Sequence, residues 1–173
     1  MRFASILLAL ALAACGQTTA PPAEAPEAEA PAPPALTGSF AAMSNTAMAI
    51  TGDIDIQPDV LSFSKGFRVE GGRIDTALEP HTDYSAGGGT IADVTGNAGI
   101  ETIELRQVTN VRIAADAAVQ PLCGPGETAS YVVLAKSPEV LSMLVFSGAD
   151  APGPNAHNSQ LCGTFNYMPT DAQ

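Results

Sequence analysis

Apolar side chains recur at every second position in two segments that follow residue 46. In residues 47–56 the alternating set is Met48, Ile50, Ile54 and Ile56. In residues 60–69 it is Leu61, Phe63, Phe67 and Val69, with "SKG" between the second and third. Because successive side chains of a strand point to opposite faces, both segments are predicted to contain strands with one buried face. We expect a bulge at Gly52 and a tight hairpin at "SKG".

Three later segments continue the pattern. "ETIELRQV" at 101–108 alternates through Ile103 and Leu105, and "VRI" at 111–113 and "GTFNYM" at 163–168 are shorter strand candidates. Their spacing again predicts strands with one face toward a core.

Two denser apolar runs are predicted to be strands buried on both faces. They are "SYVVLAK" at 130–136 and "VLSMLVFSG" at 140–148, and Pro138 lies in the turn between them. We expect this pair to be the most buried part of the domain. Its predicted core side chains are Val132, Leu134, Leu144 and Phe146.

The whole pattern predicts an all-β fold. Short strands separated by turn residues at intervals of about 8 to 12 residues are typical of an antiparallel β-barrel or sandwich. No segment keeps helical spacing through a window of about eleven residues, although 114–120, "AADAAVQ", suits one short helical turn. Residues 37–173 are long enough for one domain with a proper core. We therefore predict a single small antiparallel barrel or sandwich over this range.

A different pattern opens the chain. Arg2 is followed by an unbroken apolar stretch and then by Leu12, Ala13, Ala14 and Cys15. A basic start, a short apolar middle and small residues at its end are the marks of a secretory signal, here residues 1–14. The stretch is shorter than the roughly 20 residues of a membrane span. The alternatives for Cys15 are a chance residue after an ordinary signal and a modified residue.

The four residues 12–15, "LAAC", resemble the lipobox of bacterial lipoproteins. The resemblance implies that the signal is removed before Cys15, that the sulfur of Cys15 carries a diacylglycerol and that the new amino terminus is acylated. Several acyl chains would hold the protein on the membrane far more firmly than a single chain can. Known lipoproteins of the inner membrane commonly have Asp after this cysteine, whereas Gly16 stands here. The resemblance therefore implies the outer membrane, on its periplasmic side.

Residues 15–36 are predicted to be a lipidated N-terminus and a disordered tether. From 20 to 36 the chain has six Pro, seven Ala and three Glu, with no aromatic or β-branched residue. Such a composition cannot bury enough apolar surface to offset the entropy of ordering, and its prolines exclude a helix. We expect this segment to add nothing to the stability of the domain. A proline-rich ligand for another protein's groove is the alternative to a simple spacer.

Cys123 and Cys162 are the remaining cysteines of the three. An even pair in an exported chain predicts a disulfide, which would close a loop of about 40 residues and stabilise the fold by about 4 kcal/mol on the chain-entropy model. Neither a CxxC redox motif nor the further ligands of a structural zinc site are present. Gly124 and Gly163 follow the two cysteines, and we expect them to permit the close approach of a cross-strand bridge.

Charge and candidate chemistry narrow the function without fixing it. The formal net charge is −11, and loss of Arg2 with the signal makes it −12. So negative a chain argues against a nucleic-acid partner. It also argues against contact with anionic lipid, except through the anchor on Cys15. His81 and His157 lie in loops and could form a metal or catalytic site only if those loops converge. Asp53, Asp55 and Asp59 alternate as a solvated face would, without the spacing of a calcium loop.

The sequence therefore predicts a lipid-anchored protein of the cell envelope with no catalytic residues, no metal ligands and no cofactor assigned. The favoured hypothesis is a noncatalytic binding or assembly module that uses a strand edge or a loop to hold an envelope partner protein or a small apolar ligand. Its layout is similar to that of membrane-bound lysozyme inhibitors, which are small lipid-anchored β-barrels, although the Ser and Lys loop of those inhibitors has no counterpart here. The alternative is a periplasmic enzyme or metal site that uses the loops around His81 and His157.

Overall fold

A computed structural model describes residues 34–75, 78–97, 99–115, 117 and 121–170. The signal peptide, Cys15 and the tether up to residue 33 lie outside the described residues. So do residue 116 and residues 118–120, which make up most of the predicted helical turn at 114–120.

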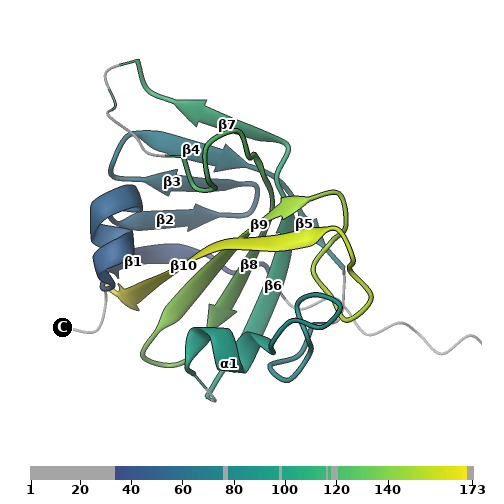
Figure 1. Ribbon diagram of the computed structural model, residues 1–173. Coiled ribbons are helices and arrows are strands. Elements are labelled where there is room, and N and C mark those ends of the chain that lie inside the picture. Colours follow the sequence, from purple (N-terminus) through teal and green to yellow (C-terminus); the bar gives the residue numbers. More distant parts are fainter. Residues whose placement is uncertain (1–33, 76–77, 98, 116, 118–120, 171–173) are drawn as a thin grey trace, which may run out of the picture. The chain divides into compact units, whose positions relative to one another are not determined.

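The described chain is all-β, as predicted, and its strands form one antiparallel sheet that curls into a half-barrel (Figure 1). The strands are β1 (Gly38–Ala42), β2 (Ile54–Gln57), β3 (Val60–Phe63), β4 (Phe67–Glu70), β5 (Arg73–Ile74), β6 (Thr102–Gln107), β7 (Asn110–Ile113), β8 (Ala129–Lys136), β9 (Leu141–Gly148) and β10 (Ser159–Pro169). Two short helices accompany them, η1 (Ala47–Thr51) and α1 (Ile91–Thr95). The "SKG" hairpin between β3 and β4 is confirmed by the pairing of Phe63 with Phe67.

The order of the strands is β5-β6-β8-β9-β10-β1-β2-β3-β4-β7. β4 and β5 belong to one extended segment, residues 67–74, and β6 and β7 belong to another, residues 102–113. Because β4 pairs with β7 while β5 pairs with β6, these two segments run beside each other. Their pairing brings the two ends of the strand order together and gives the sheet its barrel-like form.

The inner face of the curled sheet encloses the main apolar core. Its fully buried members include Ile54, Leu61, Val132, Leu134 and Phe165. These side chains come from strands on both sides of the half-barrel, so the predicted alternation in β2, β3 and β4 places its apolar side chains toward one shared interior.

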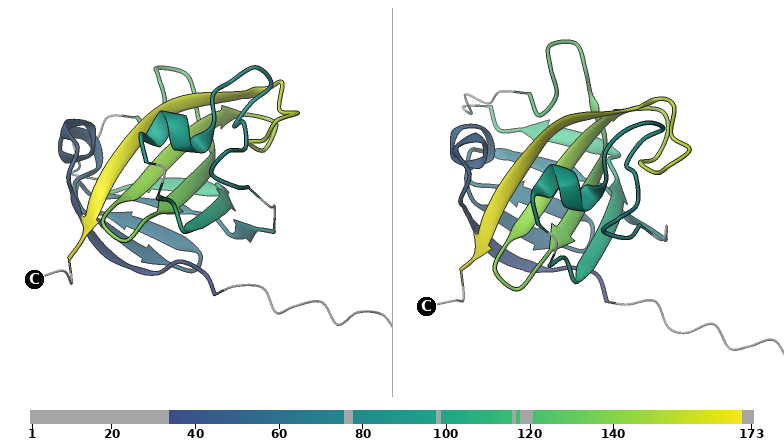
Figure 2. Two further views of the ribbon diagram at one scale, coloured as in Figure 1. Left: turned by 90° about the horizontal axis from the view of Figure 1, so that it is seen from below. Right: turned by 60° about the horizontal axis from the view of Figure 1, so that its bottom comes forward.

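A second core lies on the outer face of β6, β8 and β9. There Leu144 and Phe146 pack with Ile91 of α1 and with the segment around Tyr84, and the views in Figure 2 show α1 lying over these strands. The strands β8 and β9 are thus covered on both faces, which confirms the interpretation of their dense apolar runs. All four predicted core side chains of this pair, Val132, Leu134, Leu144 and Phe146, are completely buried.

The predicted strand over residues 47–56 is wrong in its first half. Residues 47–51 form the single turn η1, a π-helix, and the strand begins only at Ile54. Ala47 and Thr51 are fully buried, whereas Met48 is 49% exposed. The Thr51 hydroxyl donates to the Ala47 carbonyl and shares a 2.7 Å hydrogen bond with the Tyr167 hydroxyl. This buried hydroxyl pair holds the turn in place and outweighs the alternation of Met48 with Ile50.

Gly52 ends this turn and does not form the predicted bulge. Its φ is +66°, a backbone conformation that favours glycine. A Cβ at this position would also collide with the Ser64 hydroxyl in the "SKG" hairpin. The glycine is therefore needed because the helix end and the hairpin lie in close contact.

The helix α1 was not indicated by periodicity because it is only five residues long. Its signal is a capping box, in which the Thr90 hydroxyl accepts a hydrogen bond from the Asp93 amide while the Asp93 carboxylate accepts one from the Thr90 amide. The pKa of Asp93 is lowered, mainly by its hydrogen bond with the side chain of Thr90 and to a smaller extent by the one with the Thr90 backbone. Gly96 ends the helix in the left-handed conformation.

The tether as predicted extends too far, because Leu36 belongs to the core. Its side chain is only 8% exposed. Its amide donates to Glu104 Oε2 at 2.7 Å, and its carbonyl accepts from Arg106 Nη2 at 3.1 Å. The expectation that residues up to 36 add nothing to stability is therefore wrong for Leu36, and the ordered chain begins before β1.

Glu104 and Arg106 form a buried ion pair on the inner face of β6. Arg106 Nε lies 2.6 Å from Glu104 Oε1, and each side chain is only 2% exposed. Arg106 Nη1 also donates to the Gln57 carbonyl at 2.6 Å. The two charges are thus fully hydrogen-bonded, and they join β6 to the end of β2 and to the backbone of Leu36.

The predicted disulfide joins Cys123 to Cys162, with a sulfur–sulfur distance of 1.96 Å. Cys162 lies at a register shift of β10 between Leu161 and Gly163, and such a bulge re-aims a side chain that regular pairing would send elsewhere. Cys123 lies in the loop before β8, so this is not the cross-strand bridge that the glycines suggested. A Cβ on Gly124 would have no neighbour within 4 Å, and Gly124 is therefore not required for a close approach.

Candidate functional site

The outer face of the sheet carries a row of polar side chains that are in register across five strands. We call Ser39, Asp55, Ser62, Arg68 and Arg112, from β1, β2, β3, β4 and β7, the polar row. Each is the direct cross-strand partner of the next. The row follows from the alternation in these strands, because the residues between the buried apolar positions must point outward.

At the acidic end of the polar row, the carboxylate of Asp55 accepts hydrogen bonds from neutral side chains. Ser39 Oγ donates to Asp55 Oδ2 at 2.8 Å, and Gln57 Nε2 donates to Asp55 Oδ1 at 3.1 Å. At the other end Arg68 Nε donates to Ser62 Oγ at 3.2 Å. Asp55 and Arg68 therefore do not neutralise each other, although they stand only two strands apart.

The basic end of the row places two arginines directly opposite each other. Arg68 of β4 pairs with Arg112 of β7, and both side chains are exposed. Arg112 Nε lies 2.6 Å from Glu70 Oε1, whereas Arg68 has no carboxylate partner in the described part of the chain. Two of the six basic residues beyond residue 36 are thus direct cross-strand neighbours in an acidic protein.

A hollow of about 360 Å³ lies at this basic end. Ser62, Arg68 and Arg112 supply its polar wall, and Ile113 supplies an apolar one. Ile113 is 59% exposed, the largest exposed fraction among the large apolar side chains that the structure describes as exposed. The basic end therefore offers charged hydrogen-bond donors next to apolar surface, which is a combination that suits an anionic group carried on an organic ligand.

The two histidines singled out in the sequence do not form a cluster of metal ligands. Their loops do touch, because the Gly153 amide donates to the Tyr84 carbonyl at 3.0 Å. His81 and His157 are both exposed. The group of three metal-ligating residue types found among the described residues contains neither of them. Asp53, Asp55 and Asp59 also do not gather into such a group.

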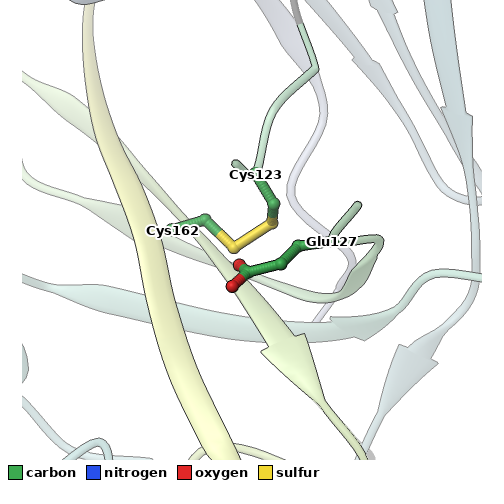
Figure 3. Close-up of side chains that lie close together, drawn as sticks. All are labelled: Cys123, Glu127 and Cys162. Carbon is green, nitrogen blue, oxygen red and sulfur yellow. A yellow bond between two sulfur atoms is a disulfide. The ribbon is translucent and has the colours of Figure 1, made fainter. Parts of the chain in front are cut away.

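That group consists of Cys123, Glu127 and Cys162, whose ligand atoms lie within 4.8 Å of one another (Figure 3). The two sulfurs are bonded to each other, so neither is a thiolate that could bind a metal ion. Glu127 Oε2 accepts a hydrogen bond from Ser147 Oγ at 3.3 Å. We interpret this group as a structural disulfide with a neighbouring carboxylate.

The arginine pair was missed by reasoning from the sequence. The outward direction of Arg68 follows from its place between Phe67 and Val69, but its neighbour Arg112 comes from a strand far along the chain. Only the register of β4 with β7 places the two guanidinium groups together. The sequence signal that was available is the scarcity of basic residues, seven in all, in a chain of net charge −11.

Comparisons with known proteins assign no family and no function to the site. No family model matches the chain, and neither the curated proteins nor the solved structures contain a match. Within the described ranges, no helix is both long enough and apolar enough to cross a membrane.

Proposed function

We propose that the protein is a lipid-anchored, noncatalytic binding module of the bacterial cell envelope, and that its basic end holds an acidic segment of an envelope partner protein. The observation that carries the proposal is the direct cross-strand pairing of Arg68 with Arg112. Like charges placed directly opposite each other destabilise a sheet. An anion seated between the two guanidinium groups would remove that repulsion.

The chemistry of the pair favours a carboxylate partner. Arginine presents a planar set of N–H donors that matches a carboxylate in a bidentate manner. Arg68 uses one of these donors on the Ser62 hydroxyl, and Arg112 uses one on Glu70, so the remaining donors face the hollow or solvent. The exposed apolar side chain of Ile113 beside them suits a peptide better than a free ion.

The strength of such binding would depend on salt. The two arginine side chains are exposed, and exposed charges are screened at ionic strengths above the physiological range. Electrostatic complementarity of this kind also speeds association more than it raises affinity. A tethered module would compensate for modest affinity through the high local concentration that a shared membrane provides.

The experiment measures binding of a labelled hexaglutamate peptide to the domain at low salt. Replacing both Arg68 and Arg112 by alanine should weaken binding about tenfold or more, since tenfold corresponds to about 1.4 kcal/mol and two charged donors are lost. Lys136→Ala is the matched control, because it removes a positive charge outside the polar row and should change binding less than twofold. Equal binding by the double variant and the unmodified domain would refute the assignment of the site.

The anchor is tested separately. If Cys15 carries the lipid, as its resemblance to the lipobox implies, Cys15→Ser should prevent normal processing or release the protein into the soluble fraction. The measurement is fractionation of cell envelopes after a high-salt wash, together with the mass of the mature protein. A Cys15→Ser protein that matures at the normal size and stays with the outer membrane would contradict the anchor and the proposed localisation on the periplasmic face.

A further inference from the structure

A second hollow, of about 470 Å³, lies beside the turn between β8 and β9. It is framed by the end of α1, the turn between β8 and β9 and the residue that follows β1, and Figure 1 shows α1 and the β8–β9 turn together at the lower end of the view. Its walls include Met43, Thr95, Asn97, Ser137, Glu139 and Asn166. We call it the polar hollow.

Two buried polar atoms beside the polar hollow have no hydrogen-bond partner among the described residues. They are Asn166 Oδ1 and Ser142 Oγ. Ser142 is only 1% exposed and is the direct cross-strand partner of Asn166. The backbone of Asn166 is already satisfied, because its amide donates to Ser44 Oγ and its carbonyl accepts from Met43 and Ser44. Unpaired buried polar atoms are rare and costly, and of these two, Asn166 Oδ1 belongs to a residue that lines the polar hollow, where it lacks a donor.

The hydroxyl donors in the walls are spent within the protein. The Thr95 hydroxyl donates to the Ile91 carbonyl at 2.9 Å, and the Ser137 hydroxyl donates to the Val140 carbonyl at 3.1 Å. The Gly99 amide donates to Asn97 Oδ1 at 2.9 Å. These groups hold the turn and the end of the helix in shape, and neither hydroxyl proton is left for a ligand.

The charged side chain in the described walls is an acceptor. Glu139 forms no hydrogen bond or ion pair with any other described residue, and its side chain is exposed at the rim. Asn166 Oδ1 lacks a donor. None of the described residues that line the polar hollow is a lysine or an arginine. The described walls therefore carry the negative charge of Glu139 and the unpaired acceptor Asn166 Oδ1, with no positive charge to balance them.

We propose that the polar hollow binds a small organic cation rich in hydrogen-bond donors, of the class of hydroxylated primary amines that includes amino sugars. An ammonium group supplies three donors and a positive charge for Glu139. Hydroxyl groups supply the donor that Asn166 Oδ1 lacks. This site shares no residue with the basic end of the polar row. Its test is therefore independent of the test of the proposed partner binding.

The test compares three sugars of nearly equal shape by isothermal titration and by amide NMR shifts. Glucosamine carries the ammonium group, N-acetylglucosamine replaces it with a neutral amide, and glucose lacks the nitrogen. We expect glucosamine to bind at least about tenfold more tightly than the other two, a difference of about 1.4 kcal/mol. The shifted amides should be those of residues 95–97, 137, 139, 140 and 166.

Variants separate the charge from the shape of the site. Glu139→Gln should weaken glucosamine binding about tenfold, whereas Glu127→Gln, the same change beside the disulfide, should have no effect. Asn166→Ala should weaken binding, and Asn166→Asp should preserve it because the acceptor is kept. Equal binding of the three sugars, binding of none of them, or unchanged binding by Glu139→Gln would overturn the proposal. The variant with Arg68 and Arg112 replaced should bind glucosamine normally, which distinguishes this site from the proposed partner site.

Discussion

Arg106→Met is expected to lower the free energy of unfolding by about 3 to 5 kcal/mol, the loss that follows when one member of a buried ion pair is removed. The variant would leave the carboxylate of Glu104 buried without its counterion at a position that is 3% exposed. It would also remove the donors to the carbonyls of Leu36 and Gln57. Urea unfolding of the domain, followed by fluorescence or circular dichroism, measures the change.

The double variant Glu104→Leu with Arg106→Met is the control. It removes both charges together and leaves an apolar pair of similar size, a replacement that is often neutral or stabilising in protein interiors. We expect it to recover more than half of the stability that the single variant loses. If the single variant were as stable as the unmodified domain, the ion pair could not be fully buried as described.

Phe146→Ala is expected to cost about 3 to 5 kcal/mol, because it empties a large, completely buried position in the outer core. Phe146 packs against Tyr84, with ring centroids 5.7 Å apart. Its two cross-strand partners, Tyr131 and Leu161, each lie at a register shift, so the neighbouring strands have fixed irregular positions and cannot easily close over a cavity. The urea concentration at the midpoint of unfolding should fall, while the slope of the unfolding free energy against urea concentration stays unchanged.

The matched control for this variant is Ile113→Ala, which removes a large apolar side chain at a position that is 59% exposed. Its cost should stay within about 0.5 kcal/mol, as for most surface substitutions. A similar loss in both variants would mean that the outer core around Phe146 is not packed as described.

The strands could be predicted from the sequence where one rule decides their burial. In β3 and β4, alternation alone identifies the buried side chains, and in β8 and β9 a continuous apolar run is sufficient. Alternation failed at Met48, because a one-turn helix buries Ala47 and Thr51 instead. Over so few residues, 47–51 fit both the alternation of a strand and the spacing of a helical turn. The sequence cannot decide between them without the tertiary contact between Thr51 and Tyr167.

The charged side chains of β6 show a second limit. The apolar positions Ile103 and Leu105 were expected to face a core, and Leu105 does so at 1% exposure. Glu104 and Arg106, between and after them, are nevertheless buried on the other face. Their burial depends on Leu36, which supplies a partner for each charge from a distant part of the chain. No local pattern contains that information.

The candidate sites were harder to predict than the fold for the same reason. Arg68 and Arg112 are brought together by strand register, and Ser142 and Asn166 by the pairing of β9 with β10. In each case the individual residue is ordinary in its own strand. The chemistry arises only from the cross-strand neighbour, and the sequence contained no motif that joins the two.

The attachment of Leu36 to the ion pair has a mechanical consequence. Force applied to the chain ahead of residue 34 reaches Leu36 before it reaches β1, which lies between β10 and β2. The load passes through the hydrogen bonds of Leu36 with Glu104 and Arg106 into β6, on another part of the sheet. A pull from that end therefore strains several buried bonds at once and does not peel β1 from its neighbours one hydrogen bond at a time.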